Sequence, residues 1–349
     1  MPEIGSTVLR ANPLEDPTWD SQLAALPAAT FFHGAAWARV LNATYGYVPS
    51  YFVGSGNGSF RSLIPLLEVD SRLTGRRGIS LPFTDECEPL AVSEDGFRSA
   101  FDEAIAYARK REWRYLELRG GRKYLGDAPA STSFYGHRLE LNANETSVFE
   151  RIDPATKRSI RKAEQSGLTI EFSRDQKAVG EFYGLLCKTR RRLGVPPQPF
   201  SFFREIHRHV LDQNKGWIVL ARLGEVPVAS AVFFRSKNTS IYKFGASDDR
   251  FQHLRANNLV MWRAIKKSIA EGLQSLDFGR TSLSNYGLRR FKLGWGTSEA
   301  IIDYVRFDLR ENRFIASRDA SSGWHSAIFR ILPSSLSRLI GMTLYKHIA

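Results

Sequence analysis

The sequence is poor in cysteine, with only Cys87 and Cys187 among its 349 residues. Neither cysteine stands in a CxxC pair or at the cysteine–histidine spacing that binds zinc. His207 and His209 are two residues apart, so on a helix they face different sides and do not suit a shared metal ion. The sequence therefore predicts two reduced thiols, no metal site and no tightly bound cofactor.

The sequence also lacks a long apolar run. The longest stretch without a charged side chain, Ser21 to Ala38, is interrupted by Pro27 and several polar residues and fails as a membrane span. Residues 1–16 lack the basic start and apolar run of a signal peptide. We expect a cytoplasmic protein, with the inner face of the membrane as a surface that it could contact.

Acidic residues are outnumbered by basic ones, 36 to 49, which gives a formal net charge of +13. Such an excess favours a polyanionic partner, either the phosphates of a nucleotide, nucleic acid or an anionic membrane surface, and does not choose among them. The 43% hydrophobic and 24% charged content is typical of a globular protein, and the length suggests about two domains.

The two halves of the chain show the same order of predicted elements. Each half contains a hairpin, a third strand, an amphipathic helix and a closing strand. In the second half these are 217–223, 226–235, 240–247, a helix through 259–269 and 275–278. In the first half they are 51–53, 62–69, 78–82, a helix over 96–111 and 115–118. This order predicts an internally duplicated α/β fold.

The polar residues 142–145 and the helix-start signal Asp153-Pro154 place the join between the halves. We expect a first domain over 1–150, a second over 151–311 and a helical tail over 312–349. Helices are also predicted at 154–165 and 175–193. The tail carries two apolar stripes flanked by basic residues, so it is either a helix docked on the core or a segment resting on an anionic membrane face: Trp324, Ile328, Ile331, Leu332; Leu336, Leu339, Ile340, Met342, Leu344.

The densest set of candidate functional residues spans 242–296. A meander that leads into a helix leaves the first backbone N–H groups of that helix unpaired, and these donors attract phosphate. Arg255 stands just before the predicted helix and Asn257 in its first turn, so both are candidate ligands of a carrier phosphate. The alternative for Arg255 is an ordinary solvated charge.

Lys292 stands between Phe291 and the stretch Leu-Gly-Trp-Gly, which is unusual for a solvated lysine. Its ammonium group is a candidate to stabilise negative charge on a tetrahedral intermediate or a substrate phosphate. The alternative is a lysine stem lying over Trp295.

Two acids are candidate general bases, each with a structural role as the alternative. Asp277 is predicted at a strand end, with Glu117 at the equivalent place in the first half, and Asp85 follows Pro82-Phe83-Thr84. The run Asp-Phe-Gly after Leu276 also occurs in kinases, but the glycine-rich ATP loop and His-Arg-Asp motif of kinases are missing from the sequence.

One predicted helix carries a basic patch, because Arg158 and Arg161 stand one turn apart beside Lys157 and Lys162. With 190–192, this patch could hold a phosphate-rich donor or acceptor. Solvated surface charge is the alternative.

Several motifs together resemble the Fem family of peptidyltransferases and their acyl-CoA-using relatives in the GNAT superfamily. The resemblance covers about residues 15–310 and rests on the order and spacing of the motifs. They are FFHGAAWARVL (31–41), YGYVPSYFV (45–53), SLPFTDECEPL (80–90), RSIRKAEQSGLTIEF (158–172), YKFGAS (242–247), RANNLVMWRAI (255–265), LDFGR (276–280) and FKLGWG (291–296).

The resemblance implies two tandem GNAT-like domains, each a mixed, mostly antiparallel sheet flanked by helices, with a cleft between the domains. It implies that Phe291-Lys292 lies at the acyl-transfer centre, and the motif residues Tyr242, Arg280 and Trp37 become candidate substrate contacts. The family's long coiled-coil arm is missing, and alanines precede Trp37 where basic phosphate ligands would stand. The chain looks closer to compact relatives linked to exopolysaccharide and PEP-CTERM systems.

The leading hypothesis is therefore an N-acyltransferase or aminoacyltransferase. It would move an acyl group from acyl-CoA or aminoacyl-tRNA to an amine or hydroxyl of a phosphate-bearing or saccharide cell-envelope precursor. Apart from tRNA, no stable nucleic-acid complex is expected. The main alternative is a non-catalytic pair of GNAT domains that binds an anionic glycan or nucleic acid, and a second is a membrane-surface scaffold held by residues 324–349.

Overall fold

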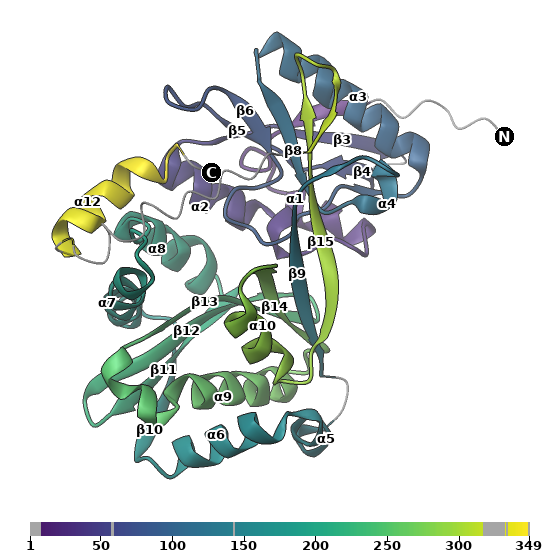
Figure 1. Ribbon diagram of the computed structural model, residues 1–349. Helices are drawn as coiled ribbons and strands as arrows, with labels where there is room; N and C mark the ends of the chain where they lie inside the picture. The colour runs from purple at the N-terminus through teal and green to yellow at the C-terminus, as the bar shows by residue number, and fades with distance from the viewer. Residues whose placement is uncertain (1–7, 57–58, 142–143, 317–331, 333, 348–349) are drawn as a thin grey trace. The chain divides into compact units, whose positions relative to one another are not determined.

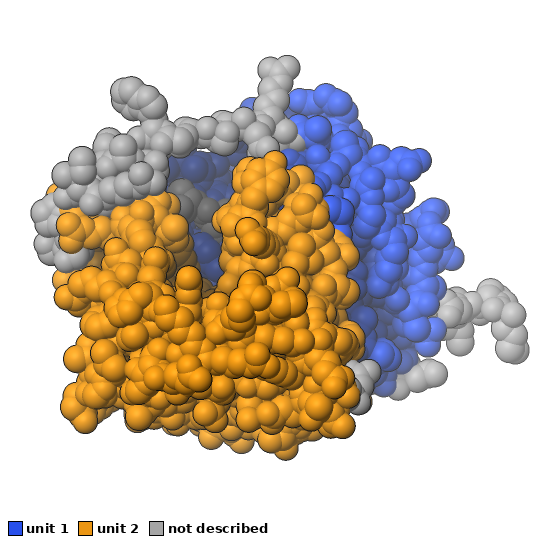
Figure 2. All heavy atoms as spheres, turned by 60° about the horizontal axis from the view of Figure 1, so that its bottom comes forward, with its two compact units in different colours: residues 1–134, 301–320, 344–349 blue, residues 135–300, 321–343 orange. Residues whose placement is uncertain are grey.

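The computed structural model describes residues 8–56, 59–141, 144–316, 332 and 334–347. The chain divides into two compact units, coloured in Figure 2. Unit 1 comprises residues 1–134, 301–320 and 344–349, and unit 2 comprises 135–300 and 321–343. The limits of these units fall inside two long strands, β9 (Ala130–Glu140) and β15 (Ser298–Asp308). They therefore differ from the predicted domain boundaries at 150 and 311.

Unit 1 contains short strands and two longer helices, α2 and α3 (Figure 1). Its elements are β1 (Val8–Ala11), α1 (Trp19–Gln22), α2 (Ala35–Tyr45), β2 (Val48–Pro49), β3 (Tyr51–Gly56), β4 (Ser59–Ile64), β5 (Leu67–Val69), β6 (Arg77–Ile79), β7 (Leu90–Ala91), α3 (Glu94–Lys110), β8 (Tyr115–Arg119), α4 (Arg122–Leu125) and β16 (Arg313–Ile315). Strands β1, β3, β4 and β7 form one antiparallel sheet. In the other, β2, β5 and β6 are antiparallel, and β6 runs parallel to β8.

The predicted helix over 96–111 is confirmed as α3, and its ends follow from its sequence. Ser93 caps the helix by accepting a hydrogen bond from the N–H of Gly96, and acidic residues stand in the first turn. Phe97, Phe101 and Ala104 recur at helical spacing and are buried against Leu116 and its neighbours.

Two predictions for unit 1 are wrong in detail. The expected strand over 62–69 is broken into β4 and β5, because Pro65 has no N–H to continue the ladder. The predicted hairpin and third strand are consequently divided between two sheets. The tail over 312–349 was expected to be helical, but it begins with the strand β16. This strand pairs with β15, and the ring of Phe314 stacks on Phe101.

Unit 2 is a helix-flanked sheet. Its elements are α5 (Glu145–Arg151), α6 (Pro154–Glu164), β10 (Leu168–Ser173), α7 (Gln176–Leu193), α8 (Phe200–Ile206), β11 (Gly216–Leu223), β12 (Val226–Ser236), β13 (Thr239–Ser247), α9 (Ala256–Ala270), β14 (Ser275–Ser282), α10 (Tyr286–Leu293) and α12 (Ser334–Leu344). Strands β10 to β13 form an antiparallel meander and β14 pairs parallel to β13. The meander over 217–247 is confirmed, while β10 was not predicted.

The two faces of this sheet are covered by different helices (Figure 1). Alternate residues of β11 and β12, such as Val219 and Ala231, belong to the core under α9, where Ile265 is fully buried. The helix α7 packs against β12 and β13 and buries Phe182 and Leu186. Both helices follow the 3.6-residue period, so each places one apolar stripe on the sheet.

The C-terminal prediction is confirmed only in part. Trp324, Ile328 and Ile331 lie outside the described residues, and the second apolar stripe belongs to α12. Within the described ranges, no helix is long and apolar enough to cross a membrane.

Candidate functional site

The strands β13 and β14 separate after a short paired stretch. Their parallel pairing runs from Thr239–Ser275 to Ile241–Asp277, and no further ladder between them is formed in the described part of the chain. The remainder of β13, from Tyr242 to Ser247, therefore faces an opening in the sheet on one side while β12 pairs with the other. A strand edge that faces an opening offers backbone donors and acceptors to a ligand.

Three pockets of unit 2 meet around Phe291, which lines all of them. Their volumes are about 560, 280 and 210 Å³. The first and second share Arg255 and Asn258, and the second and third share Ser247 and Asn257. The shared walls make one groove that passes the start of α9 and follows β13.

The start of α9 forms the centre of this groove. Arg255 is the N-cap residue and adopts a left-handed backbone conformation with φ 58°, which is uncommon outside glycine. No side chain caps the helix, so its first N–H groups lack that partner. Asn257 donates a hydrogen bond to the Ser247 hydroxyl at 3.2 Å and joins the helix start to the end of β13.

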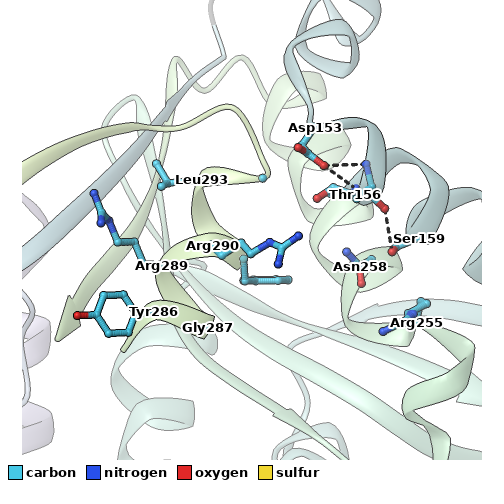
Figure 3. Close-up of a pocket in the computed structure, with 13 residues that line it drawn as sticks. Asp153, Thr156, Ser159, Arg255, Asn258, Tyr286, Gly287, Arg289, Arg290 and Leu293 are labelled. Atoms are coloured by element: carbon cyan, nitrogen blue, oxygen red, sulfur yellow. Dashed lines mark hydrogen bonds between the residues drawn. The ribbon is translucent and has the colours of Figure 1, made fainter. Parts of the chain in front are cut away.

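The first pocket has a basic wall on α10 and a hydroxyl wall on α6 (Figure 3). Thr156 and Ser159 line it from α6, and Arg290 extends toward them from α10. Arg289 points the other way and is held by Glu299 through two hydrogen bonds of 2.8 and 2.7 Å.

Two guanidinium groups of this pocket are not neutralised. Among the described residues, neither Arg255 nor Arg290 forms an ion pair, and both are exposed. An unpaired arginine beside the start of a helix is suited to bind phosphate or carboxylate. The predicted role of Arg255 as a phosphate ligand fits this position.

The loop between β13 and α9 is fixed by a buried carboxylate. Asp248 accepts hydrogen bonds from Arg250 and Lys188, each at 2.7 Å. The hydrogen bonds from Arg250, followed by that from Lys188, hold the pKa of Asp248 well below its usual range, so the carboxylate stays charged. The wall of the second pocket is therefore ordered by an ion network.

The third pocket forms the other end of the groove and contains the predicted contact Tyr242. Ala231, Val260 and Met261 line it from β12 and α9. Burial raises the pKa of Tyr242 to about 12, so the phenol stays protonated at neutral pH. A Cβ atom at Gly245 would overlap the Tyr242 hydroxyl, so the glycine makes room for the phenol.

Lys292 is buried and binds the backbone of β14. Its ammonium group donates hydrogen bonds of 2.9 Å to the carbonyl oxygens of Gly279 and Arg280. Gly279 has φ +67°, and its N–H donates to the Asp277 carboxylate at 2.7 Å. Asp277 lies within β14, which runs to Ser282, and not at a strand end as predicted. Lys292 and Asp277 together hold a distorted segment of β14, and neither lines the three pockets.

A histidine that sequence reasoning missed lies near Lys292. His137, on β9, is buried, and its ring nitrogens have no hydrogen-bond partner among the described atoms. Burial, then the charge of Lys292, lowers the pKa of His137 to about 4. The proximity of His137 to Lys292 has no local sequence signal, because the two residues are far apart in the chain.

Other predicted residues lie away from the groove. Arg158 and Arg161 are exposed on α6 but do not line it. Arg280 contributes its backbone carbonyl to the Lys292 contact. In unit 1, Trp37 is fully buried and donates to the carbonyl oxygen of Pro82 at 3.3 Å, which makes it a core residue and corrects its prediction as a substrate contact.

The remaining acids are in unit 1. Asp85 is half-buried, and its backbone carbonyl accepts a hydrogen bond from the Tyr304 hydroxyl at 2.7 Å. Glu117, predicted as the equivalent of Asp277, is buried between Arg119 at 3.2 Å and Arg306 at 2.8 Å. Burial alone would raise the pKa of Glu117, but these two arginines lower it, as expected for a structural ion pair.

The groove residues missed from the sequence are those of α10 and α6: Tyr286, Arg290, Thr156 and Ser159. The doubled arginine before Phe291 was the available signal. In the described part of the chain, no group of three or more histidine, cysteine or acidic side chains is arranged to hold a metal ion.

Comparison with known proteins identifies the fold. Residues 155–293 match the family described as "Acetyltransferase (GNAT) domain". The structure is similar to FemX, with a TM-score of 0.68 and 14% identity over 85% of this chain and 96% of that chain. It is also similar to L-PGS from Bacillus licheniformis, with a TM-score of 0.56 and 14% identity over 95% of this chain and 98% of that one.

A third similar structure is a tandem GNAT protein from the clavulanic acid biosynthesis pathway, with a TM-score of 0.55 and 11% identity over 87% of this chain and 99% of that one. No curated protein matches the chain in sequence. The predicted fold, two tandem GNAT-like domains, is confirmed, and so is the predicted resemblance to FemAB-like GNAT proteins.

Proposed function

Because residues 155–293 match a GNAT acetyltransferase domain, we propose that this chain moves an acyl group from an acyl-CoA thioester to an amine of a cell-envelope precursor. One observation supports the donor above all. The unpaired Arg255 and Arg290 and the uncapped start of α9 meet in a single pocket. That arrangement fits the compact cluster of phosphates that CoA carries.

The groove gives this donor a direction. The phosphates lie at the start of α9, and the pantetheine arm follows the edge of β13 past Asn257. The acyl group occupies the third pocket beside the apolar side chains of Val260 and Met261. Binding along a strand edge positions the thioester without requiring a charged side chain at the reacting carbon.

The proposed reaction is a direct transfer. The acceptor amine, in its neutral form, attacks the thioester carbonyl carbon and forms a C–N bond. The tetrahedral intermediate collapses with loss of the C–S bond, and the thiolate takes up the proton that the amine loses. Backbone N–H groups of β13 stabilise the oxyanion by hydrogen bonding, as preorganised donors do in acyl transfer.

The predicted bases Asp277 and Asp85 are tested by replacement with asparagine. A base that accepts the amine proton lowers kcat when it is removed, and carrier binding stays unchanged. A variant in which both kcat and KM are unchanged would exclude that residue as the base.

The acceptor class rests on the resemblance to Fem-type enzymes and on the net charge of +13. Such a charge attracts a phosphate-bearing or saccharide acid precursor. The two alternatives for the whole protein are transfer from aminoacyl-tRNA and a non-catalytic GNAT pair that binds an anionic glycan or nucleic acid.

The test is a binding and turnover measurement on the full chain. Acetyl-CoA, longer acyl-CoAs and charged tRNA are offered separately, with free CoA as competitor and mass spectrometry of the products as readout. We expect saturable acyl-CoA binding that weakens about tenfold in Arg255→Ala, the loss of one charge-assisted contact.

Arg263→Ala is the matched control, because Arg263 is exposed on the same helix α9 but does not line the groove. Binding of charged tRNA alone would replace the proposed donor by an aminoacyl carrier. Salt-sensitive binding of an anionic glycan with neither acyl-CoA binding nor product would favour the non-catalytic alternative.

A further inference from the structure

The helix α12 turns its small residues toward unit 2. Ser337 and Gly341, one turn apart, are buried. A Cβ atom at Gly341 would overlap the carbonyl oxygen of Pro197, so the helix backbone lies directly on the segment that follows α7. The close approach requires glycine at this position and fixes which face of α12 points away from the protein.

The opposite face of α12 is apolar. Leu336, Leu339 and Met342 follow one another at three-residue intervals, with 43%, 57% and 58% of their surface exposed. A surface helix of a globular protein ordinarily buries its large apolar side chains and exposes its polar ones. In α12 this arrangement is reversed, so the exposed stripe requires a partner that is itself apolar.

The charged side chains in the sequence around this stripe are all basic. The sequence from Ala320 to Ala349 contains no aspartate or glutamate but carries Arg330, Arg338 and Lys346. Arg338 is exposed on α12. The partner should therefore be anionic as well as apolar.

The neighbouring helix adds to this charge. Burial raises the pKa of the Cys187 thiol on α7, and the nearby Arg338 charge acts in the opposite direction, so Arg338 lies beside α7. Arg191 stands one turn after Cys187, and both Arg191 and Arg192 are exposed at the end of α7. Arg338 on α12 and two arginines at the end of α7 thus expose cations on two neighbouring helices.

We propose that the α12 stripe of Leu336, Leu339 and Met342 docks on the surface of an anionic lipid bilayer. The helix lies in the plane of the interface, its leucines reach the acyl boundary, and Arg338 and Arg191 contact lipid phosphates. The stripe does not depend on the groove, so this proposal stands or falls separately from acyl transfer. Docking would bring the groove to the surface where envelope precursors anchored to lipid are found.

The experiment uses the full chain and two kinds of vesicle, one of phosphatidylcholine and one that also contains phosphatidylglycerol. Co-sedimentation measures the bound fraction. We expect binding to the anionic vesicles that falls at least ~10-fold in the triple variant Leu336→Gln, Leu339→Gln, Met342→Gln. Glutamine keeps helix propensity near that of leucine, so α12 itself is retained.

A matched control replaces three exposed apolar residues of unit 1, in the variant Leu9→Gln, Leu73→Gln, Val92→Gln. We expect this control to bind anionic vesicles as the unaltered chain does. Thermal melting and acyl-CoA binding of both variants verify that the fold and the groove are intact.

Three results would overturn the proposal. The first is an unaltered chain that does not sediment with anionic vesicles, and the second is a triple variant that binds as well as the control. The third is equal binding to the two kinds of vesicle, which would remove the anionic requirement. Size-exclusion chromatography tests a specific alternative, which is that the stripe joins two copies of this chain. A triple variant that differs from the unaltered chain only in oligomeric state would support that alternative.

Discussion

The ammonium group of Lys292 lies 2.9 Å from the carbonyl oxygen of Gly279, and this contact joins α10 to a distorted segment of β14. A second bond of the same length reaches Arg280. Because Phe291 is the next residue and lines all three pockets, the contact also fixes a wall of the groove. Lys292 thus positions the groove, whatever further part it takes in acyl transfer.

Replacing Lys292 with methionine is expected to lower both stability and turnover. The buried carbonyl oxygen of Gly279 and the partly buried one of Arg280 lose their donor, which costs about 1–3 kcal/mol for the buried oxygen. Turnover falls by ~10²–10³ if the ammonium also stabilises the oxyanion. Melting temperature and kcat are measured on the same preparation.

Lys266→Met is the control, because Lys266 is a partly exposed lysine paired with Glu145 and is expected to change stability by less than ~0.5 kcal/mol. Unchanged turnover of Lys292→Met at a temperature where the variant is folded would exclude the oxyanion role and leave the positioning role.

Arg290→Ala is expected to weaken acyl-CoA binding by about five- to tenfold. The affinity of the variant should also depend less steeply on salt concentration than that of the unaltered chain. The guanidinium faces the hydroxyl wall of the pocket and is unpaired among the described residues, so its removal costs one phosphate contact. Titration calorimetry at two salt concentrations measures both effects. Affinity equal to that of the unaltered chain would remove Arg290 from the donor site.

Gly245→Ala is expected to reduce the size of acyl group that the enzyme accepts. The added methyl group displaces the Tyr242 hydroxyl into the third pocket of about 210 Å³. In a series of acyl-CoA substrates, kcat/KM should fall most for the longest chain. Adding Tyr242→Phe removes the overlapping oxygen and should restore part of the loss; a uniform loss across the series would contradict a role in acyl selection.

The stability of the protein is expected to fall as the pH drops from about 6.5 toward 4. The pKa of His137 is about 4 in the folded chain, below the 6.5 of an unperturbed histidine. The unfolded chain therefore binds a proton in this range while the folded chain does not, so the stability present above pH 6.5 is lost, by up to about 3 kcal/mol. Melting at pH 7 and pH 5 should show a smaller drop in His137→Phe, and an equal drop would refute the assignment.

Much of unit 2 could be predicted because its periodicity is strong and local. Alternation in β11 and β12 identified the meander, and helical spacing identified α9 with Arg255 at its start. The strand–loop–helix order placed Arg255 at the start of α9, and the resemblance singled out Phe291; both residues line the first pocket, and their roles in binding stay predictions.

The rest depends on contacts that a local pattern does not encode. Trp37 stands in a motif shared with a family, yet its indole is needed in the core of unit 1. The burial of Lys292 depends on the distorted conformation at Gly279, and its proximity to His137 depends on pairing between distant strands. Pro65 divides a strand whose apolar pattern is otherwise continuous.

The early end of the pairing between β13 and β14 also bears on how such a site can change during evolution. Every residue except proline carries a peptide N–H, so contacts made to a strand edge survive almost any replacement of the side chains along it. The means of holding a carrier can then outlast the loss of recognisable sequence identity, while the acyl pocket and the acceptor contacts diversify around it. Within Tyr242–Ser247, only a substitution by proline would remove a backbone donor outright.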